Sequence, residues 1–379
     1  MKKSTRMKFM VVGLTMLLVC FVFTSISLGQ QVSTTGSRLV VFADDWTLGN
    51  FFSFSSNQGV LFAENVFSWL TEYASPEVKN KILIDEAYAD QDVSGQNLTG
   101  LISTLTGLGF SVDIIHPSEW TPSLLAGYGA VLLERGQPFT NDDSTIVKSY
   151  ILNGGGAIIV GGGLPENLTN HNNIINPFGL QVNTWTSITQ LPGGPNGEYI
   201  LTSFVPHSIT DGISSLWTMN PTPIVLALDE LEFNQAPMIL CTQQPDDPDK
   251  WPQDVNWLAV WERIGVTIDI KPGSDPNCFK INGQGVIPVA ILGSANFDVY
   301  NIDPDTLIFG GLTVRVRGNK GPLCHIEDTN NDSFLDLVCQ FEDDATAWIA
   351  GDSTATLTGN LLDGSAIEGT DSICIVPPE

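Results

Sequence analysis

Residues 140–163 read TNDDSTIVKSYILNGGGAIIVGGG, and this stretch joins a capped helix to a short apolar strand. Thr140 is followed three residues later by Asp143, which is the spacing of a capping box and predicts the start of a helix. Gly154 is suited to end that helix, because glycine readily adopts the left-handed conformation that follows many helix C-termini. The run 157–160 is wholly apolar and predicts a buried strand. A helix followed closely by such a strand is typical of α/β proteins with a parallel sheet.

The same alternation extends toward the N-terminus. Between the strands, apolar residues recur with helical spacing over 60–70 and 98–108. The further strands that short apolar runs predict are 39–42, 82–84, 112–115 and 130–133. The sequence therefore predicts an α/β domain over residues 30–262, with a parallel sheet covered by helices on both faces.

Three motifs in this domain resemble class I glutamine-amidotransferase-like domains. They are residues 82–86 (ILIDE), residues 153–156 (NGGG) with the strand and glycine turn that follow, and residues 206–212 (PHSITDG). The third motif is similar to a His-Pro-Ile-Thr-x-Gly stretch of that family, with Ser208 in place of proline. The resemblance covers about 200 residues and implies a flavodoxin-like sheet.

The resemblance does not extend to the catalytic residues. Catalytic members of the family carry a cysteine at a sharp turn after a strand, where a helix N-terminus and a histidine activate the thiolate. The comparable turn here, residues 161–163, consists of glycine alone. Cys241 lies within an apolar run, and we expect it to be a buried free thiol. We therefore predict a domain with no catalytic residues.

Acidic residues follow three of the predicted strands. Ligands of open α/β sheets bind outside the carboxyl ends of the strands, so these side chains could together hold a metal ion or sugar hydroxyls. The candidate ligand-binding residues are Asp45, Asp85, Glu86 and Glu134. The alternative is that they are ordinary polar strand ends that face water.

The pattern changes near residue 263. Short β-branched runs occur at 266–270, 286–292, 312–316, 336–341 and 355–357, and turn residues separate them. No helical period is present. This pattern predicts an antiparallel β-sandwich domain over residues 263–379.

The clearest local motif of this second domain is residues 328–336, DTNNDSFLD, where oxygen-bearing side chains recur at positions 1, 3, 5 and 9. A tight loop can turn alternate residues inward around one ion, and Ca²⁺ prefers six to eight oxygen ligands. We predict a calcium site in which Phe334 contributes its carbonyl oxygen. The predicted side-chain ligands are Asp328, Asn330, Asp332 and Asp336.

The motif differs from a full EF-hand. Position 12 is Cys339 where a bidentate glutamate would stand, and position 6 is Ser333 where glycine would make the sharp turn. The pattern is closer to the shorter DxDxDGxxD loops of extracellular β-domains. The alternative interpretation is an Asp/Asn-rich hairpin turn without a metal.

The second domain as a whole resembles a repeat module of exported bacterial and archaeal proteins. The resemblance implies an accessory surface module and supplies no catalytic residues. The stretches that carry it are 268–273 (IDIKPG), 285–293 (GVIPVAILG), 297–299 (FDV), 325–328 (HIED) with the acidic loop, 355–359 (ATLTG) and 368–371 (EGTD).

Four cysteines lie in the second domain, and an even set in one exported domain predicts disulfides. Cys324 and Cys339 bracket the acidic loop and could lie opposite one another on a hairpin. Cys278 and Cys374 would then tie the first turn to the last strand. Four cysteines allow three pairings, and the sequence leaves the choice open.

The N-terminus and the charge indicate the compartment. Basic residues precede the apolar run 9–23, and small residues precede Gln30, which predicts a signal peptide over residues 1–29. An uncleaved membrane anchor is the alternative. The chain has 42 acidic and 16 basic residues, so it should repel nucleic acid. We expect a secreted, cell-surface or periplasmic protein that contacts a membrane only if the signal is uncleaved.

Two functions are compatible with these features. The first is an exported, non-catalytic binding or structural protein with a calcium-stabilised β-module and an extracellular ligand, a glycan or a protein. The second is an exported hydrolase that uses the acidic strand ends, with carbohydrate as its candidate substrate. A carboxylate pair about 5–10 Å apart across a cleft would favour the hydrolase.

Overall fold

The computed structural model describes most of the chain after the predicted signal peptide. The described residues are 35–43, 48, 57–85, 98–115, 120–133, 140–160, 171–182, 198–219, 223–232, 235–243, 255–280, 285–344, 346–349 and 351–376. The signal peptide predicted over residues 1–29 lies outside them. Within the described part, no helix combines the length and the apolar character needed to span a membrane.

The first part of the chain alternates strands with helices, as the sequence predicts. Its helices are α1 (Asn57–Thr71), α2 (Thr99–Gly107), α3 (Pro122–Leu125) and α4 (Asn141–Leu152). Its parallel strands are β1 (Thr35–Phe42), β2 (Lys81–Asp85), β3 (Ser111–Ile115), β4 (Ala130–Leu133) and β5 (Gly156–Val160). The shorter strands that follow are β6 (Leu180–Val182), β7 (Glu198–Leu201), β8 (Leu216–Met219), β9 (Ile224–Leu226) and β10 (Met238–Gln243).

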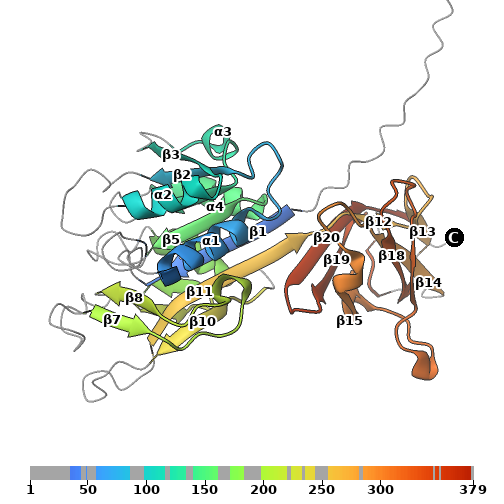
Figure 1. Cartoon of the computed structure of the whole chain (residues 1–379). Coiled ribbons are helices and arrows are strands. Elements are labelled where there is room, and N and C mark those ends of the chain that lie inside the picture. Colours follow the sequence, from blue (N-terminus) through green and yellow to red (C-terminus); the bar gives the residue numbers. More distant parts are fainter. Residues whose placement is uncertain are drawn as a thin grey trace, which may run out of the picture. The chain divides into compact units, whose positions relative to one another are not determined.

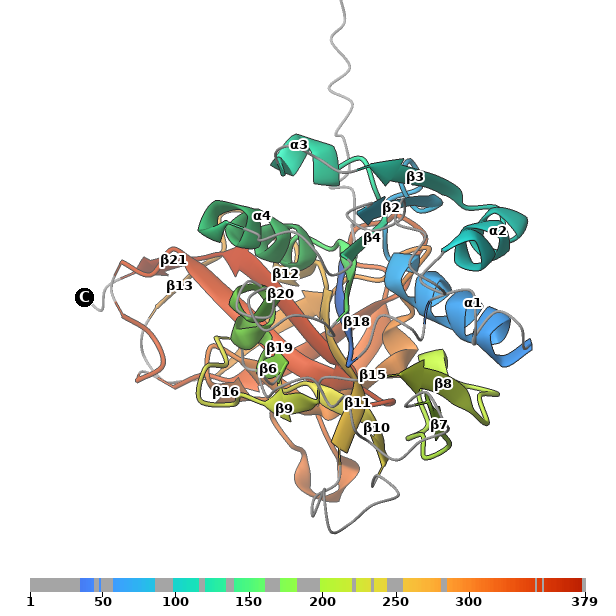
Figure 2. The ribbon, with the colours of Figure 1, turned by 90° about the vertical axis from the view of Figure 1, so that its left-hand side faces the viewer.

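The five parallel strands lie side by side in the order β3-β2-β4-β5-β1. Figure 2 shows α4 on one side of these strands and α1 and α2 on the other. The strands β4 and β5 are buried along their whole length, which is what two covered faces require. The predicted parallel strands with helices on both faces are thus present, within a sheet that also contains antiparallel strands.

The helix that opens the motif 140–163 is capped as predicted. The backbone N–H of Asp143 donates to Thr140 Oγ1 over 3.1 Å, and the Thr140 N–H donates to Asp143 Oδ2 over 2.9 Å. Gly154 has a φ of +93°, so the chain leaves the helix through a conformation that favours glycine. The reciprocal hydrogen bonds satisfy two backbone donors at the helix start.

One long strand, β11 (Val255–Gly265), connects the parallel sheet to the second part of the chain (Figure 1). It pairs antiparallel with β1 from Leu258 to Gly265. Its last two residues, Ile264 and Gly265, pair in parallel with Ile367 and Glu368 of β20. The predicted boundary between residues 262 and 263 therefore lies inside a strand. The sequence analysis did not identify this strand.

The second part of the chain is built of β-strands, as predicted. They are β12 (Ile268–Ile270), β13 (Cys278–Lys280), β14 (Val286–Ile291), β15 (Ile302–Phe309), β16 (Leu312–Thr313), β17 (Cys324–Glu327), β18 (Asp336–Glu342), β19 (Thr354–Leu361), β20 (Ala366–Ser372) and β21 (Cys374–Val376). Strands β12, β14, β18 and β17 form an antiparallel sheet in that order. Strands β16, β15, β19 and β20 pair antiparallel and continue through β11 into the large sheet.

The buried apolar side chains divide into two main clusters. The first extends from Leu39 to Trp261 and fills the space around the parallel strands. The second begins at Ile264 and includes side chains of both sheets of the C-terminal part, such as Val289 and Phe341 on one and Leu357 on the other. The fold is thus of the mixed α/β class, with a large mixed sheet and a separate antiparallel sheet.

Both proposed disulfides are present. Cys278 pairs with Cys374 across 96 residues, and Cys324 pairs with Cys339 across 15 residues. In the loop-entropy account, closures of these lengths stabilise the folded state by roughly 3 to 5 kcal/mol each. Cys241 is a buried free thiol in β10, as expected.

Candidate functional site

The acidic loop lies at the tip of the hairpin formed by β17 and β18. Cys324 and Cys339 are directly opposite one another in the register of that hairpin, so their disulfide closes its base. Glu327 and Asp336 form the last pair before the loop. The loop is therefore held at both ends by strand pairing and covalently at its base.

Three side chains of the loop fold back onto its own backbone. Asp328 accepts the backbone N–H groups of Asp332 and Ser333, over 3.2 and 3.1 Å. Asn330 Oδ1 accepts the Asp332 N–H over 3.0 Å. Asp332 Oδ1 in turn accepts the Phe334 N–H over 2.8 Å. These contacts turn oxygens at positions 1, 3 and 5 toward the inside of one tight turn.

Two residues of the loop have positive φ angles, Asn331 at 60° and Ser333 at 76°. Ser333 occupies the position where related loops carry glycine. It adopts the left-handed conformation that such a turn needs, although this conformation is strained for a residue with a β-carbon. The sharp turn predicted for the loop is therefore made with serine.

Asp336 is placed differently from the other predicted ligands. It is fully buried at the start of β18. Its Oδ1 accepts the Gly293 N–H over 2.9 Å, and its Oδ2 accepts the Thr329 N–H and hydroxyl over 2.7 and 2.6 Å. Asp336 thus ties the loop to the turn after β14. Phe334, the residue predicted to contribute a carbonyl oxygen, has a side chain that is 40% exposed.

The side chains of the loop can be compared with the ligands that Ca²⁺ prefers. Asp328, Asn330 and Asp332 offer only oxygen ligands, which suits a hard cation. Because Asp336 is turned toward Gly293, the loop brings two carboxylates and one amide together. Within the described residues, no group of three or more His, Cys, Asp or Glu side chains is placed to hold a metal ion.

Of the four predicted acidic strand ends, three lie outside the described residues: Asp45, Glu86 and Glu134. Asp85 is the last residue of β2 and is 2% exposed. The hydrolase alternative rests on this group of acids and stays a prediction.

Cys241 and His171 lie in buried surroundings that shift their pKa values. Burial raises the pKa of the Cys241 thiol to about 12, so the thiol stays protonated at neutral pH. Burial also lowers the pKa of His171, which is fully buried, to about 4. Both groups are therefore neutral at physiological pH.

The sequence analysis did not identify a buried arginine that holds several residues together. Arg38 on β1 forms ion pairs with Glu72 over 2.8 Å and with Glu262 over 2.5 Å. Its guanidinium also donates to the Trp69 carbonyl and lies 4.5 Å from the ring centres of Trp69 and Tyr73. The sequence does contain a signal for this cluster, because Arg38 directly precedes the apolar run 39–42. An arginine buried at such a position needs acidic partners to compensate its charge.

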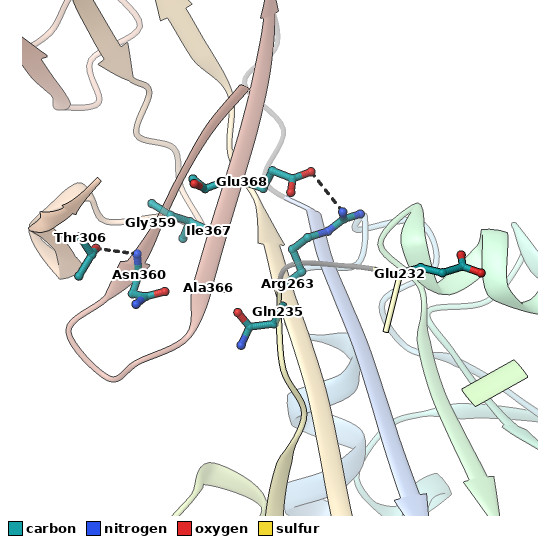
Figure 3. A pocket seen from close by; sticks show the side chains of 10 residues that line it. Glu232, Gln235, Arg263, Thr306, Gly359, Asn360, Ala366, Ile367 and Glu368 are labelled. Carbon is teal, nitrogen blue, oxygen red and sulfur yellow. Dashed lines mark hydrogen bonds and ion pairs between the residues drawn. The ribbon is translucent and has the colours of Figure 1, made fainter. Parts of the chain in front are cut away.

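Two cavities flank β11 where it meets the hairpin of β19 and β20. One, of about 680 Å³, is lined by Arg38, Glu262 and Ile264 among others. The other, of about 420 Å³, is lined by Arg263, whose side chain is directed toward Glu368 in Figure 3, with 3.2 Å between the charged atoms. Successive side chains of a strand point to opposite faces, so the two cavities lie on the two faces of β11.

Comparisons with known proteins give no family. No family model matches the chain, and no curated protein matches it. Among solved structures, a tri-modular GH5 (subfamily 4) endo-beta-1,4-glucanase from Bacillus licheniformis is 10% identical, with a TM-score of 0.15. The match covers 73% of this chain and 55% of the glucanase chain. At that TM-score the likeness carries no argument about fold or function.

Proposed function

We propose that this chain is an exported, non-catalytic binding or structural protein whose C-terminal β-module is stabilised by Ca²⁺. In this proposal the module is an antiparallel β-sandwich, and the preceding domain is a flavodoxin-like domain that resembles glutamine amidotransferases without their nucleophile. The observation that carries the proposal is the set of hydrogen bonds from loop N–H groups to the side-chain oxygens of Asp328, Asn330 and Asp332. The partner of such a protein is an extracellular glycan or protein.

Loop chemistry supports the calcium part of the proposal. Asp328, Asn330 and Asp332 would bind the ion directly, together with the carbonyl of Phe334 and water. Asp336 would act through its hydrogen bonds or through a bridging water, since position 9 of such loops often binds through water. The oxygens already accept backbone N–H groups, and each oxygen keeps a further lone pair for the cation.

Two observations support export and the absence of catalysis. Disulfides form and persist in oxidising compartments, and two link cysteines of the C-terminal part. The thiol of Cys241 is protonated and buried in β10, away from any turn that could present it to a substrate. These properties favour a binding or structural role for the protein, because a protonated, buried thiol is not suited to act as a nucleophile.

The test is thermal melting of the mature chain, residues 30–379, in millimolar calcium and in EDTA. We expect a higher melting temperature in calcium, because an ion that binds only the folded state stabilises it. Asp332→Ala should remove the difference. Asp305→Ala, which changes an exposed aspartate outside the loop, should retain it.

The whole mature chain is the right material for this test, because the C-terminal part shares β11 with the parallel sheet. Identical melting of the wild-type chain in calcium and in EDTA would reject the calcium site. A calcium effect that persists in Asp332→Ala would reject the assignment to this loop.

A further inference from the structure

The larger of the two cavities beside β11 is a second place where this protein can bind a ligand. It is separate from the acidic loop and depends on no metal. Both parts of the chain line it, with Trp69 and His207 from the first part and Leu362 and Asp363 from the hairpin of β19 and β20. Its volume of about 680 Å³ falls within the range of small-molecule sites.

Arg38 gives this cavity a rigid wall. Its guanidinium lies between two aromatic rings and two carboxylates, Trp69 and Tyr73 with Glu72 and Glu262. The charge of Arg38 is therefore already compensated and is not offered to an anionic ligand. Burial raises the pKa of Tyr73 to about 12, so its hydroxyl also stays protonated.

His207 offers a hydrogen-bond donor to the cavity. Its Nδ1 accepts the backbone N–H of Ile209 over 3.2 Å, which leaves the proton of the neutral ring on Nε2. Its ring packs edge-on against Trp69, with 5.2 Å between the ring centres. Burial and the nearby Arg38 lower the pKa of His207 to about 4, so the ring is neutral at physiological pH and Nε2 donates.

Hydrogen-bond acceptors also line the cavity. Asp363 belongs to the turn between β19 and β20, and its Oδ1 accepts the Ser365 N–H over 2.9 Å. Glu72 is a further lining residue, and its side chain is about half exposed. Three carboxylates and one guanidinium line the cavity, so its charge is negative overall.

These features select a class of ligand by its hydrogen bonding. An anion would be repelled by the carboxylates and finds Arg38 already paired. A simple cation would leave the Nε2 donor of His207 without an acceptor. A hydroxyl group accepts from His207 and donates to Asp363, and a ring of C–H groups can pack on the apolar wall that Met238 and Leu362 contribute.

We propose that this cavity binds a neutral, hydroxyl-rich ligand of the saccharide class, held between His207 and Asp363. The inference goes beyond the calcium proposal and does not depend on it. The cavity volume suits one or two sugar rings.

The experiment measures binding of neutral sugars to the mature chain by calorimetry, in EDTA so that calcium has no part in the result. The probes are glucose, galactose, N-acetylglucosamine, cellobiose and maltose at millimolar concentrations. We expect at least one of them to bind. Glucuronate and ethanolammonium, which carry opposite charges, should bind more weakly or not at all.

His207→Ser is the decisive variant. Serine keeps a side-chain oxygen that can cap the turn at Ile209, so the fold should survive. It loses the Nε2 donor, and sugar binding should weaken on the order of tenfold or more. The matched control is His325→Ser, the same change at an exposed residue of β17, which should bind as the wild type does.

Three results would overturn the inference. They are the failure of every neutral sugar to bind, unchanged sugar binding in His207→Ser, and binding of ethanolammonium in place of sugars. None of these bears on the calcium site, because the melting test reports on Asp332 and this test reports on His207.

Discussion

Asp336 and Asp328 have the same side chain and belong to the same acidic motif, yet their surroundings and their hydrogen-bond partners differ. Asp328 is exposed and accepts N–H groups of its own loop. Asp336 is fully buried and accepts from the Gly293 N–H. Gly293 has no room for a side chain, since an added Cβ would lie 2.2 Å from the Leu335 carbonyl oxygen. Burial therefore makes Asp336 a structural anchor, whereas Asp328 stays exposed to solvent.

This distinction predicts unequal effects of two alanine substitutions. In EDTA, Asp336→Ala should destabilise the folded state by roughly 3 kcal/mol, because it leaves buried N–H donors of Gly293 and Thr329 without an acceptor. Asp328→Ala should cost far less, since water can replace its exposed contacts. Chemical denaturation of both variants provides the measurement. Equal losses in the two variants would contradict the anchor role of Asp336.

His171 predicts a dependence of stability on pH. Burial lowers its pKa from 6.5 to about 4 in the folded state, so the unfolded chain binds the proton more readily. The neutral ring therefore contributes stability that is complete above about pH 6.5 and is lost as the pH falls toward about 4. His171→Gln should show a smaller loss of stability than the wild type between about pH 7 and about pH 5. Parallel pH profiles of the two proteins would contradict the prediction.

At the scale of elements, α4 shows how a short sequence signal specifies a boundary. The capping box of Thr140 and Asp143 begins the helix, and the buried residues Val147 and Ile151 hold it against the sheet. The hairpin of β17 and β18 is specified in a similar way by paired cysteines and an acidic turn. In both elements, hydrogen bonds between near neighbours in sequence set the ends.

Removal of the N-terminal cap of α4 should have a modest effect on stability. Thr140→Ala should lower the free energy of unfolding by about 1 kcal/mol, because the Asp143 N–H loses its acceptor. Thr145→Ala is the matched control, since Thr145 is exposed and its hydroxyl only donates to Asn141 within the helix. It should change stability by less than about 0.5 kcal/mol. Chemical denaturation measures both, and an equal loss in Thr145→Ala would contradict the capping role.

At the scale of the whole molecule, β11 joins two sheets that the sequence describes as separate. It pairs with β1 along most of its length and with β20 at its end, and the ion pair of Arg263 with Glu368 lies at this junction. The two hydrophobic clusters meet between Trp261 and Ile264 on the same strand. If either part of the chain unfolds, strands of the other part therefore lose neighbours to which they are hydrogen-bonded.

The shared strand predicts cooperative unfolding. Calorimetry of the mature chain should show one transition, because β11 cannot separate from one sheet without disturbing the other. Asp336→Ala, although it lies in the C-terminal part, should move this transition to lower temperature without splitting it. Two resolved transitions, of which only one moves, would contradict the prediction.

Much of the fold could be predicted from local patterns. Apolar runs located the strands β2, β4 and β5, and helical spacing located α1 and α2, because burial of one face leaves a periodic trace in the sequence. The spacing of the cysteines around the acidic loop also indicated their pairing. The strand β11 was missed, although residues 257–261 (WLAVW) form an apolar run that could have revealed it.

The sequence alone thus determined the class of each segment, the cap of α4 and the oxygen-rich composition of the loop. Tertiary structure alone decided that Asp336 is an anchor, that β11 is shared, and that Arg38 and His207 come to line one cavity with Asp363. The physical reason is the range of the interactions. Periodicity and capping act between neighbours along the chain, whereas burial, strand pairing and the meeting of side chains depend on residues that lie far apart in the sequence.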